Sequence, residues 1–255
     1  MRAPVLASEN LGLIVDNTQL LDAIETKFAK PEVTAIIGPN GAGKTSFLRL
    51  LAGITTPTNG SITINDRALG SISPRERSRM IGYLPQSPSL AWSIPVKDVV
   101  SLGRFAFGGA PGTLNADECA VVEQAMMTCA IDHLANRSST SLSGGEAARM
   151  HCARLIAANT PIMLADEPCA SLDPFHQHTV MQILARQAQS GKTVIVVLHD
   201  LNLAYQYADR CLVFDHGRLI SDGPAKSVLT SETMKSTFKV DIIKTTEGIM
   251  VRPRS

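Results

Sequence analysis

The chain has 255 residues, of which 44% are hydrophobic, and carries a formal net charge of +1 at pH 7. This length and composition predict one large domain with a substantial core, or a domain with an inserted subdomain. The near-zero charge gives no indication of nucleic acid or an anionic membrane as a partner.

The first clear element is an apolar, β-favouring run over 33–37 that leads into a glycine-rich loop and then a helix over 45–51. The loop fits the pattern G-x-x-x-x-G-K-[ST] at every fixed position, and its glycines let backbone N–H groups point at phosphate oxygens. An ordinary turn is the weaker alternative in this strand-loop-helix context. We expect Lys44 to reach the β- and γ-phosphates and the Thr45 hydroxyl to bind Mg²⁺. The predicted nucleotide-binding residues here are Gly38, Pro39, Asn40, Gly41, Ala42, Gly43, Lys44, Thr45 and Ser46.

The stretch over 86–142 differs in composition. It follows Pro85 and contains Pro88 and Pro95 near its start, a Gly- and Pro-rich segment over 108–112 and a helical pattern over 116–130. This pattern predicts a mostly helical insertion between two sheet-forming halves. Within it, a short apolar patch fits either a contact with a membrane protein or the core of the insertion. The patch consists of Leu90, Trp92, Ile94 and Val96.

A helix start follows the insertion. Ser143 and Glu146 have the S-x-x-E spacing of a capping box ahead of a helical run over 147–158. The free N–H groups of such a helix start attract anions, and Gly144 and Gly145 have no side chain to block a phosphate. A plain helix cap is the alternative. We expect Ser143, Gly144 and Gly145 to contact a phosphate group.

Two later apolar runs, over 162–165 and 193–198, predict strands that are buried on both faces of a parallel sheet. Asp166 and Glu167 end the first run, at the sheet edge where ligands of α/β folds bind. Asp166 can hold Mg²⁺ through water, and Glu167 is then placed to polarise the attacking water. Alone, the pair would indicate a solvated strand end.

The last part of the chain contains a predicted β-hairpin, with strands at 211–214 and 218–220 around a turn. A helix is expected over 227–238, followed by a short tail with β preference. His176 and His178 could suggest a metal pair, but residues two apart on a helix do not face one another, so a solvated surface is the better prediction.

Cysteine usage and hydropathy bear on the compartment. The five cysteines are scattered without metal-ligand spacing, which favours a reduced, cytosolic protein. The start of the chain has too short an apolar stretch for a signal peptide. Its longest apolar runs, such as 194–198, are far below the roughly 18 residues that a membrane helix needs. If the protein serves a membrane, another chain spans it.

The order of these motifs, with LSGGE at 142–146, resembles the ATP-binding-cassette (ABC) ATPases over about 6–251. The resemblance implies a single α/β domain: a P-loop NTPase core, an antiparallel β subdomain and an inserted α-helical subdomain. The inserted subdomain is expected over about 87–158, and a C-terminal helix and tail over about 225–255. It also implies ATP and Mg²⁺ as cofactors. In this family LSGGE closes over the ATP held by the P-loop of a second copy, so a dimer with two enclosed nucleotides is expected.

Further positions match the family. Gln86 resembles the Q-loop glutamine that contacts Mg²⁺ and the water, His199 the switch histidine near the γ-phosphate, and Ser171-Leu172-Asp173 the D-loop that crosses to the other copy. The implied catalytic residues are Lys44, Gln86, Glu167 and His199. The implied metal ligands are Thr45, Gln86 and Asp166.

This sequence also departs from the family pattern at three positions. Val15 stands where an aromatic residue usually stacks on adenine, Ala148 replaces a glutamine after LSGGE, and Cys169 replaces a threonine. None of these changes removes a catalytic group. They bear on nucleotide affinity and rate.

Finer similarities concern the branch of the family. The segments 95–104, 172–177 and 197–204 resemble importers of iron-siderophores, haem and cobalamin. They imply a peripheral motor subunit at the cytoplasmic face of the inner membrane. Its partners would be permease subunits and, indirectly, a substrate-binding protein, but no nucleic acid. The alternatives are a subunit of another separate-chain ABC transporter, or a soluble ABC ATPase or regulator that is not coupled to transport.

Overall fold

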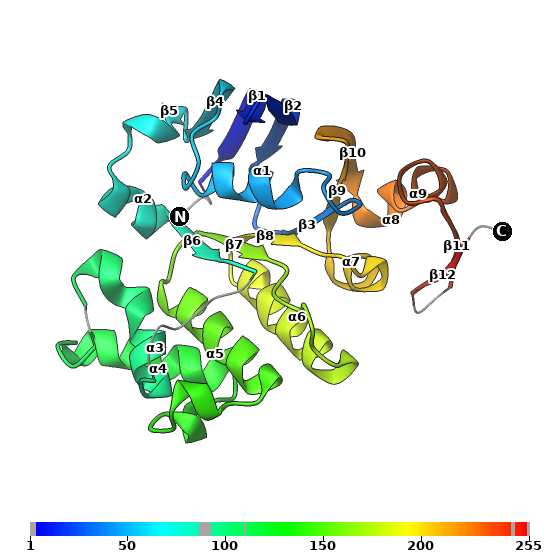
Figure 1. The fold of residues 1–255 in the computed structure, drawn as a ribbon. Coiled ribbons are helices and arrows are strands. Elements are labelled where there is room, and N and C mark those ends of the chain that lie inside the picture. The colour runs from blue at the N-terminus through cyan, green and yellow to red at the C-terminus, as the bar shows by residue number, and fades with distance from the viewer. Residues whose placement is uncertain (1–3, 87–92, 110, 246–247, 254–255) are drawn as a thin grey trace.

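The centre of the molecule is a six-stranded sheet with the order β10-β9-β3-β8-β7-β6 (Figure 1). The computed structural model describes residues 4–86, 93–109, 111–245 and 248–253. Five of the strands are parallel and β10 is antiparallel to β9. The strands are β3 (Val33–Ile37), β6 (Ile81–Leu84), β7 (Ile162–Asp166), β8 (Thr193–Val197), β9 (Arg210–Asp215) and β10 (Arg218–Pro224).

Burial explains why these strands could be predicted. Every residue of β3, β7 and β8 is buried, as expected for continuous apolar runs covered on both faces. The predicted hairpin is also confirmed, because Asp215 of β9 pairs with Arg218 of β10.

A second, four-stranded antiparallel sheet lies above the central one, with α1 between them (Figure 1). Phe47 of α1 packs against Phe214 of β9, with 5.1 Å between the ring centroids. This arrangement confirms the expected α/β core with an antiparallel β subdomain. The elements are β1 (Leu6–Val15), β2 (Thr18–Phe28), β4 (Asn59–Ile64), β5 (Arg67–Ala68) and α1 (Lys44–Leu51).

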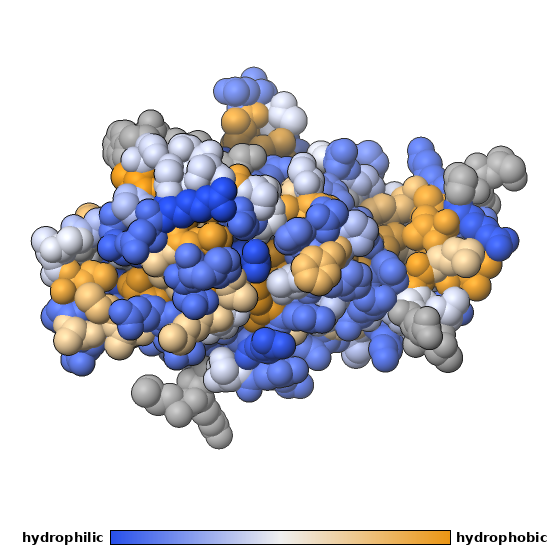
Figure 2. Space-filling view, turned by 90° about the horizontal axis from the view of Figure 1, so that it is seen from below, coloured by the Kyte–Doolittle hydropathy of each residue, from blue (hydrophilic) through white to orange (hydrophobic). Residues whose placement is uncertain are grey.

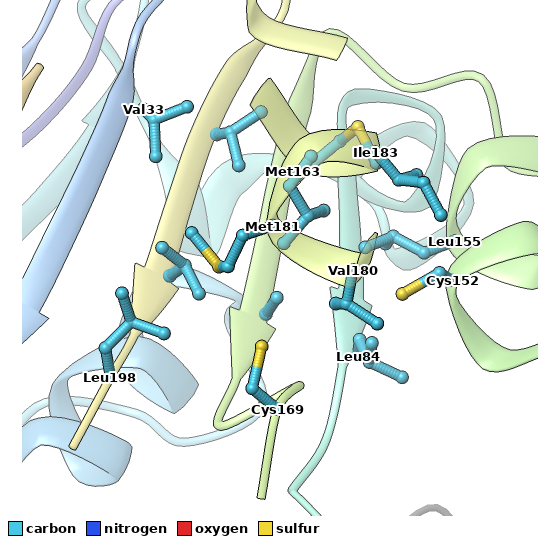
Figure 3. Packing of buried hydrophobic residues seen from close by; sticks show 14 of the residues in the cluster. Val33, Leu84, Cys152, Leu155, Met163, Cys169, Val180, Met181, Ile183 and Leu198 are labelled. Atoms are coloured by element: carbon cyan, nitrogen blue, oxygen red, sulfur yellow. The ribbon is translucent and has the colours of Figure 1, made fainter. Parts of the chain in front are cut away.

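Helices cover the other face and one end of the central sheet. In Figure 3, the α6 side chains Val180, Met181 and Ile183 lie over the sheet near Met163 of β7. The helices predicted over 116–130 and 147–158 are confirmed as α4 and α5. The helices are α2 (Pro74–Met80), α3 (Val96–Ser101), α4 (Ala116–Thr128), α5 (Gly144–Ala157), α6 (Pro174–Gln189), α7 (Leu201–Tyr207), α8 (Ala225–Val228) and α9 (Ser231–Phe238), with 3₁₀ turns η1 (Leu69–Ser71), η2 (Leu102–Phe107), η3 (Asp132–Leu134) and η4 (Ser139–Ser141).

The apolar patch of the insertion is described only in part. Leu90 and Trp92 lie outside the described residues. Ile94 is partly buried against the main hydrophobic core, and Val96 is fully buried in it. This part of the patch therefore belongs to the core. The boundaries expected for the helical subdomain, at about 87 and 158, stay a prediction.

The prediction of a single helix over 227–238 is wrong. The structure has two helices there, because α8 ends at Val228 and α9 begins at Ser231. Thr230 has an extended backbone, and its side chain accepts a hydrogen bond from the Thr233 N–H. This N-cap starts a new helix in place of a continuous one.

The predicted β-favouring tail forms the hairpin of β11 (Val240–Lys244) and β12 (Ile249–Pro253). Its outer side chains Ile243, Met250 and Val251 are exposed. Figure 2 shows apolar surface at the right end of the molecule, where this hairpin lies. Within the described part of the chain, no helix combines the length and the hydropathy that a bilayer crossing requires.

Candidate nucleotide-binding site

The order of the strands explains how distant residues meet. The neighbouring strands β3, β8, β7 and β6 run parallel, so their carboxyl ends lie at one edge of the sheet. The glycine-rich loop follows β3 and His199 follows β8. Asp166 ends β7, Glu167 comes directly after it, and Gln86 follows β6. The fold thereby brings the sequence-predicted residues of all four strands to the edge where α/β proteins bind ligands.

The glycine-rich loop turns sharply into α1 at Gly43. This residue has φ +95°, and a Cβ there would lie 2.6 Å from Leu21 Cδ2 and 2.8 Å from the Leu20 carbonyl oxygen. Only glycine fits both the backbone conformation and the space. The turn places the start of α1 directly behind the loop, and the positive end of the helix dipole then faces any bound phosphate.

Lys44 is 5% exposed and lies inside the loop. Its Nζ donates to the carbonyl oxygens of Gly38 (2.8 Å) and Pro39 (2.9 Å). Burial lowers the pKa of Lys44, an effect opposed by the charges of Glu167 and Asp166. Neutral carbonyl oxygens of the loop thus hold the ammonium group, which can exchange these acceptors for phosphate oxygens.

Asp166 is 1% exposed at the end of β7. It accepts a hydrogen bond from Thr45 Oγ1 (3.1 Å) and one from the Tyr83 hydroxyl at 3.5 Å. Burial raises the pKa of Asp166, and burial together with the Asp166 charge raises the pKa of Tyr83 to about 12. A buried carboxylate beside a hydroxyl offers the hard oxygen ligands that Mg²⁺ prefers, so these residues fit the predicted metal position.

Glu167 contacts two other predicted site residues, Gln86 and His199. Its carboxylate accepts a hydrogen bond from Gln86 Nε2 (2.6 Å), and its other oxygen lies 2.5 Å from His199 Nε2. The Glu167 side chain is 10% exposed, whereas that of His199 is 45% exposed. The backbone of Glu167 has φ +49° and its N–H donates to the Val197 carbonyl on β8. Such a backbone is uncommon outside glycine and is typical of functional sites.

The start of α5 is formed as the sequence predicts. Ser143 Oγ accepts a hydrogen bond from the Glu146 N–H (3.3 Å), and Glu146 Oε2 accepts one from the Ser143 N–H (2.8 Å). This is the reciprocal capping box. In the described part of the chain, no hydrogen bond or ion pair joins 143–146 to the glycine-rich loop. Within the described residues, the two predicted phosphate sites are therefore not bonded to each other.

The three departures from the family pattern have distinct surroundings. Val15 is 43% exposed at the end of β1. Ala148 lines a cavity of about 340 Å³ between α5 and Glu167. Cys169 is buried, which raises the pKa of its thiol to about 12, and it lies 3.7 Å from the Gln177 carbonyl. The small Ala148 side chain leaves space in this cavity, which Glu167 also lines.

Three contacts were not predicted from the sequence. Tyr83 meets Asp166, although its only signal was its place in the strand before Gln86. The histidines of α6 have separate partners, since His176 Nδ1 pairs with Asp173 Oδ2 (2.7 Å) and His178 Nδ1 with the Tyr207 hydroxyl (2.9 Å). Across the residues that the structure describes, there is no group of three or more His, Cys, Asp or Glu that could hold a metal ion.

Comparison with known proteins identifies a family that this chain matches. The family model described as "ABC transporter" matches residues 21–170. Hemin import ATP-binding protein HmuV of Nocardia farcinica is 38% identical over 239 residues, which cover 94% of this chain and 82% of that protein. HmuV of Pseudomonas putida is 37% identical over 244 residues, 94% of each. A chain from the inward-facing structure of an ABC transporter of the proposed metal-chelate type superposes with a TM-score of 0.82 at 28% identity, covering 98% of this chain and 96% of that chain.

Proposed function

This chain belongs to the ABC transporter family of ATP-binding proteins, and we propose that it is the ATP-hydrolysing motor subunit of an importer for an iron-siderophore, haem or a related metal chelate. Relatives named as hemin import proteins match 94% of the chain, and the similar solved chain comes from a transporter of the proposed metal-chelate type. The subunit itself does not touch the cargo, so support for the cargo class comes from these relatives.

The observation that carries the proposal is the cluster around Glu167. A carboxylate held by Gln86 and His199 lies beside the loop and lysine of a nucleotide site. In the proposed mechanism, the loop N–H groups and Lys44 bind the β- and γ-phosphates of ATP. Thr45, Asp166 and Gln86 would hold Mg²⁺, which neutralises negative charge on the phosphates when it is bound.

Hydrolysis transfers the γ-phosphoryl group to water. Glu167 orients the water and accepts a proton from it as the new P–O bond forms and the bond to the β-phosphate oxygen breaks. Its hydrogen bond from Gln86 fixes the direction of the carboxylate. His199, nearly half exposed, is free to turn from Glu167 to the γ-phosphate and to stabilise the charge there.

The second predicted phosphate site would be completed by a second copy. Ser143, Gly144 and Gly145 begin α5 with N–H groups suited to a phosphate, yet no bond links them to the glycine-rich loop of the same described chain. We propose that they close over the ATP of a partner copy. Closure and reopening of this dimer would move permease subunits in the membrane, with cargo delivered by a substrate-binding protein. The subunit would then lie at the cytoplasmic face of the inner membrane.

The test is ATP hydrolysis by the chain, alone and with its permease in proteoliposomes, with Lys44→Ala as the inactive control. A haem-loaded or siderophore-loaded binding protein should stimulate hydrolysis only in the complete complex. Hydrolysis at the same rate with and without the permease would indicate a soluble ABC ATPase. ATP binding without hydrolysis in either setting would indicate a regulator and refute the motor.

A further inference from the structure

The two adjacent glycines at the start of α5 lie in different surroundings. A Cβ added to Gly145 would lie 2.1 Å from Cδ2 and 2.4 Å from Nε2 of His176, on α6. Atoms that are not bonded to each other do not approach this closely. Among the described residues, a Cβ on Gly144 would meet only Leu172 Cδ2, at 4.0 Å. Gly145 therefore has no room for a side chain, because an imidazole fills its place. The described residues leave the space beside Gly144 open.

His176 is held firmly in that position. Asp173 is the N-cap of α6, and its Oδ1 accepts a hydrogen bond from the His176 N–H (3.0 Å). Its Oδ2 lies 2.7 Å from His176 Nδ1. The Phe175 ring packs edge-on to the imidazole at 5.3 Å. One carboxylate thus fixes both the backbone and the ring of His176. The contact at Nδ1 turns the opposite edge of the ring, Cδ2 and Nε2, towards Gly145.

These contacts join two segments with related predicted tasks. Gly145 belongs to 142–146, which we expect at the partner's γ-phosphate, and Asp173 ends 171–173, which resembles the segment that crosses to the partner. In the described structure the imidazole ring stands between them. A small displacement of one would then displace the other, because packed side chains transmit strain.

We propose that Asp173 and His176 form a positioning dyad that fixes the start of α5 to the start of α6, so that both segments meet a second copy as one rigid unit. The inference rests on the proposed function, since it requires a nucleotide shared between copies. His176 acts through Gly145 and touches no nucleotide itself. Gly144 and Gly145 consequently serve different purposes: the first leaves space for the phosphate, the second for His176.

The experiment is a suppressor test on the complete transporter. Gly145→Ala and Gly144→Ala are each made alone and combined with His176→Ala. We expect Gly145→Ala to lose most turnover and to recover it, up to the level of His176→Ala, in the double variant. Gly144→Ala should show no recovery. His176→Ala alone should lower kcat about tenfold, the effect of one lost hydrogen bond to a charged group, with KM for ATP nearly unchanged.

A conservative replacement separates positioning from general packing. His176→Asn keeps an N–H donor for Asp173 near the place of Nδ1, so it should regain part of the turnover that His176→Ala loses. Binding of a fluorescent ATP analogue to the glycine-rich loop should be equal in all His176 variants. Unequal binding, or the same turnover for His176→Ala and wild type, would overturn the dyad.

Failure of the dyad and failure of the proposed function look different. If the wild type hydrolyses ATP with its permease but His176→Ala does not rescue Gly145→Ala, the dyad is wrong and the motor stands. If the wild type itself does not hydrolyse ATP, both are wrong. Thermal unfolding of Gly145→Ala, with and without His176→Ala, reports independently whether the clash at Gly145 is relieved.

Discussion

Replacement of Arg104 is expected to destabilise the protein strongly. Arg104 is 5% exposed on η2, and its guanidinium pairs with both carboxylate oxygens of Glu118 on α4. It also donates to the Ala157 carbonyl on α5 (2.7 Å) and lies 4.0 Å from the centroid of the Phe107 ring. One side chain thus joins η2, α4 and α5 of the helical insertion.

The expected loss of stability depends on the Glu118 charge that remains after Arg104→Ala. Removal of one partner of a buried ion pair costs about 3–5 kcal/mol, because the other charge stays buried without compensation. The Glu118 side chain is 20% exposed and can recover some hydration, so we expect the lower end, about 3 kcal/mol. For a chain of this size that corresponds to a fall in Tm of about 6–12 °C.

The assay is urea and thermal unfolding of the nucleotide-free chain. A matched control exists in Arg67→Ala, which breaks an Arg–Glu pair whose side chains are 56% and 44% exposed. That variant should unfold like the wild type, because exposed ion pairs contribute little. If the two variants shifted the unfolding midpoint equally, the argument from burial would be refuted.

Two further predictions concern the nucleotide site. Asp166→Asn should abolish hydrolysis yet raise the free energy of unfolding of the nucleotide-free protein at pH 7 to 8. Burial raises the pKa of Asp166, so the wild type loses stability as the pH rises from 3.8, the ordinary pKa, through the raised pKa of the folded state. Chemical unfolding should therefore show no gain in stability for the variant below pH 3.8. Val15→Tyr should strengthen ATP binding about tenfold in equilibrium titrations, because one base–aromatic stack contributes about 1–3 kcal/mol; unchanged affinity would mean that adenine does not bind near Val15.

The sequence predicts the strands and the residues of the site for one physical reason. The strands β3, β7 and β8 are continuous apolar runs, and the candidate site residues end them or follow them closely in the chain. Parallel pairing then brings the strand ends together whatever the details of the connections. The capping box at Ser143 is local and could be predicted for the same reason, since its partners are three residues apart.

The remaining contacts depend on packing between elements that are distant in sequence. Tyr83 meets Asp166 only because β6 pairs with β7, and Arg104 meets Glu118 only because η2 lies across α4. The imidazole of His176 fills the place of a side chain at Gly145 because α5 and α6 approach closely. The break at Thr230 shows a different limit, in which one N-cap outweighs the helical preference of its neighbours.

The most direct test of the central claim is the ATP-dependent dimer of Glu167→Gln, measured by light scattering alongside hydrolysis. Glu167 lies between Gln86 and His199. If it is the catalytic base, its replacement should lower turnover by a factor of about 10² to 10⁴. Bound ATP should then persist and hold two copies together, while ADP should not. A variant that stays monomeric with ATP bound, or that hydrolyses ATP like the wild type, would contradict the account.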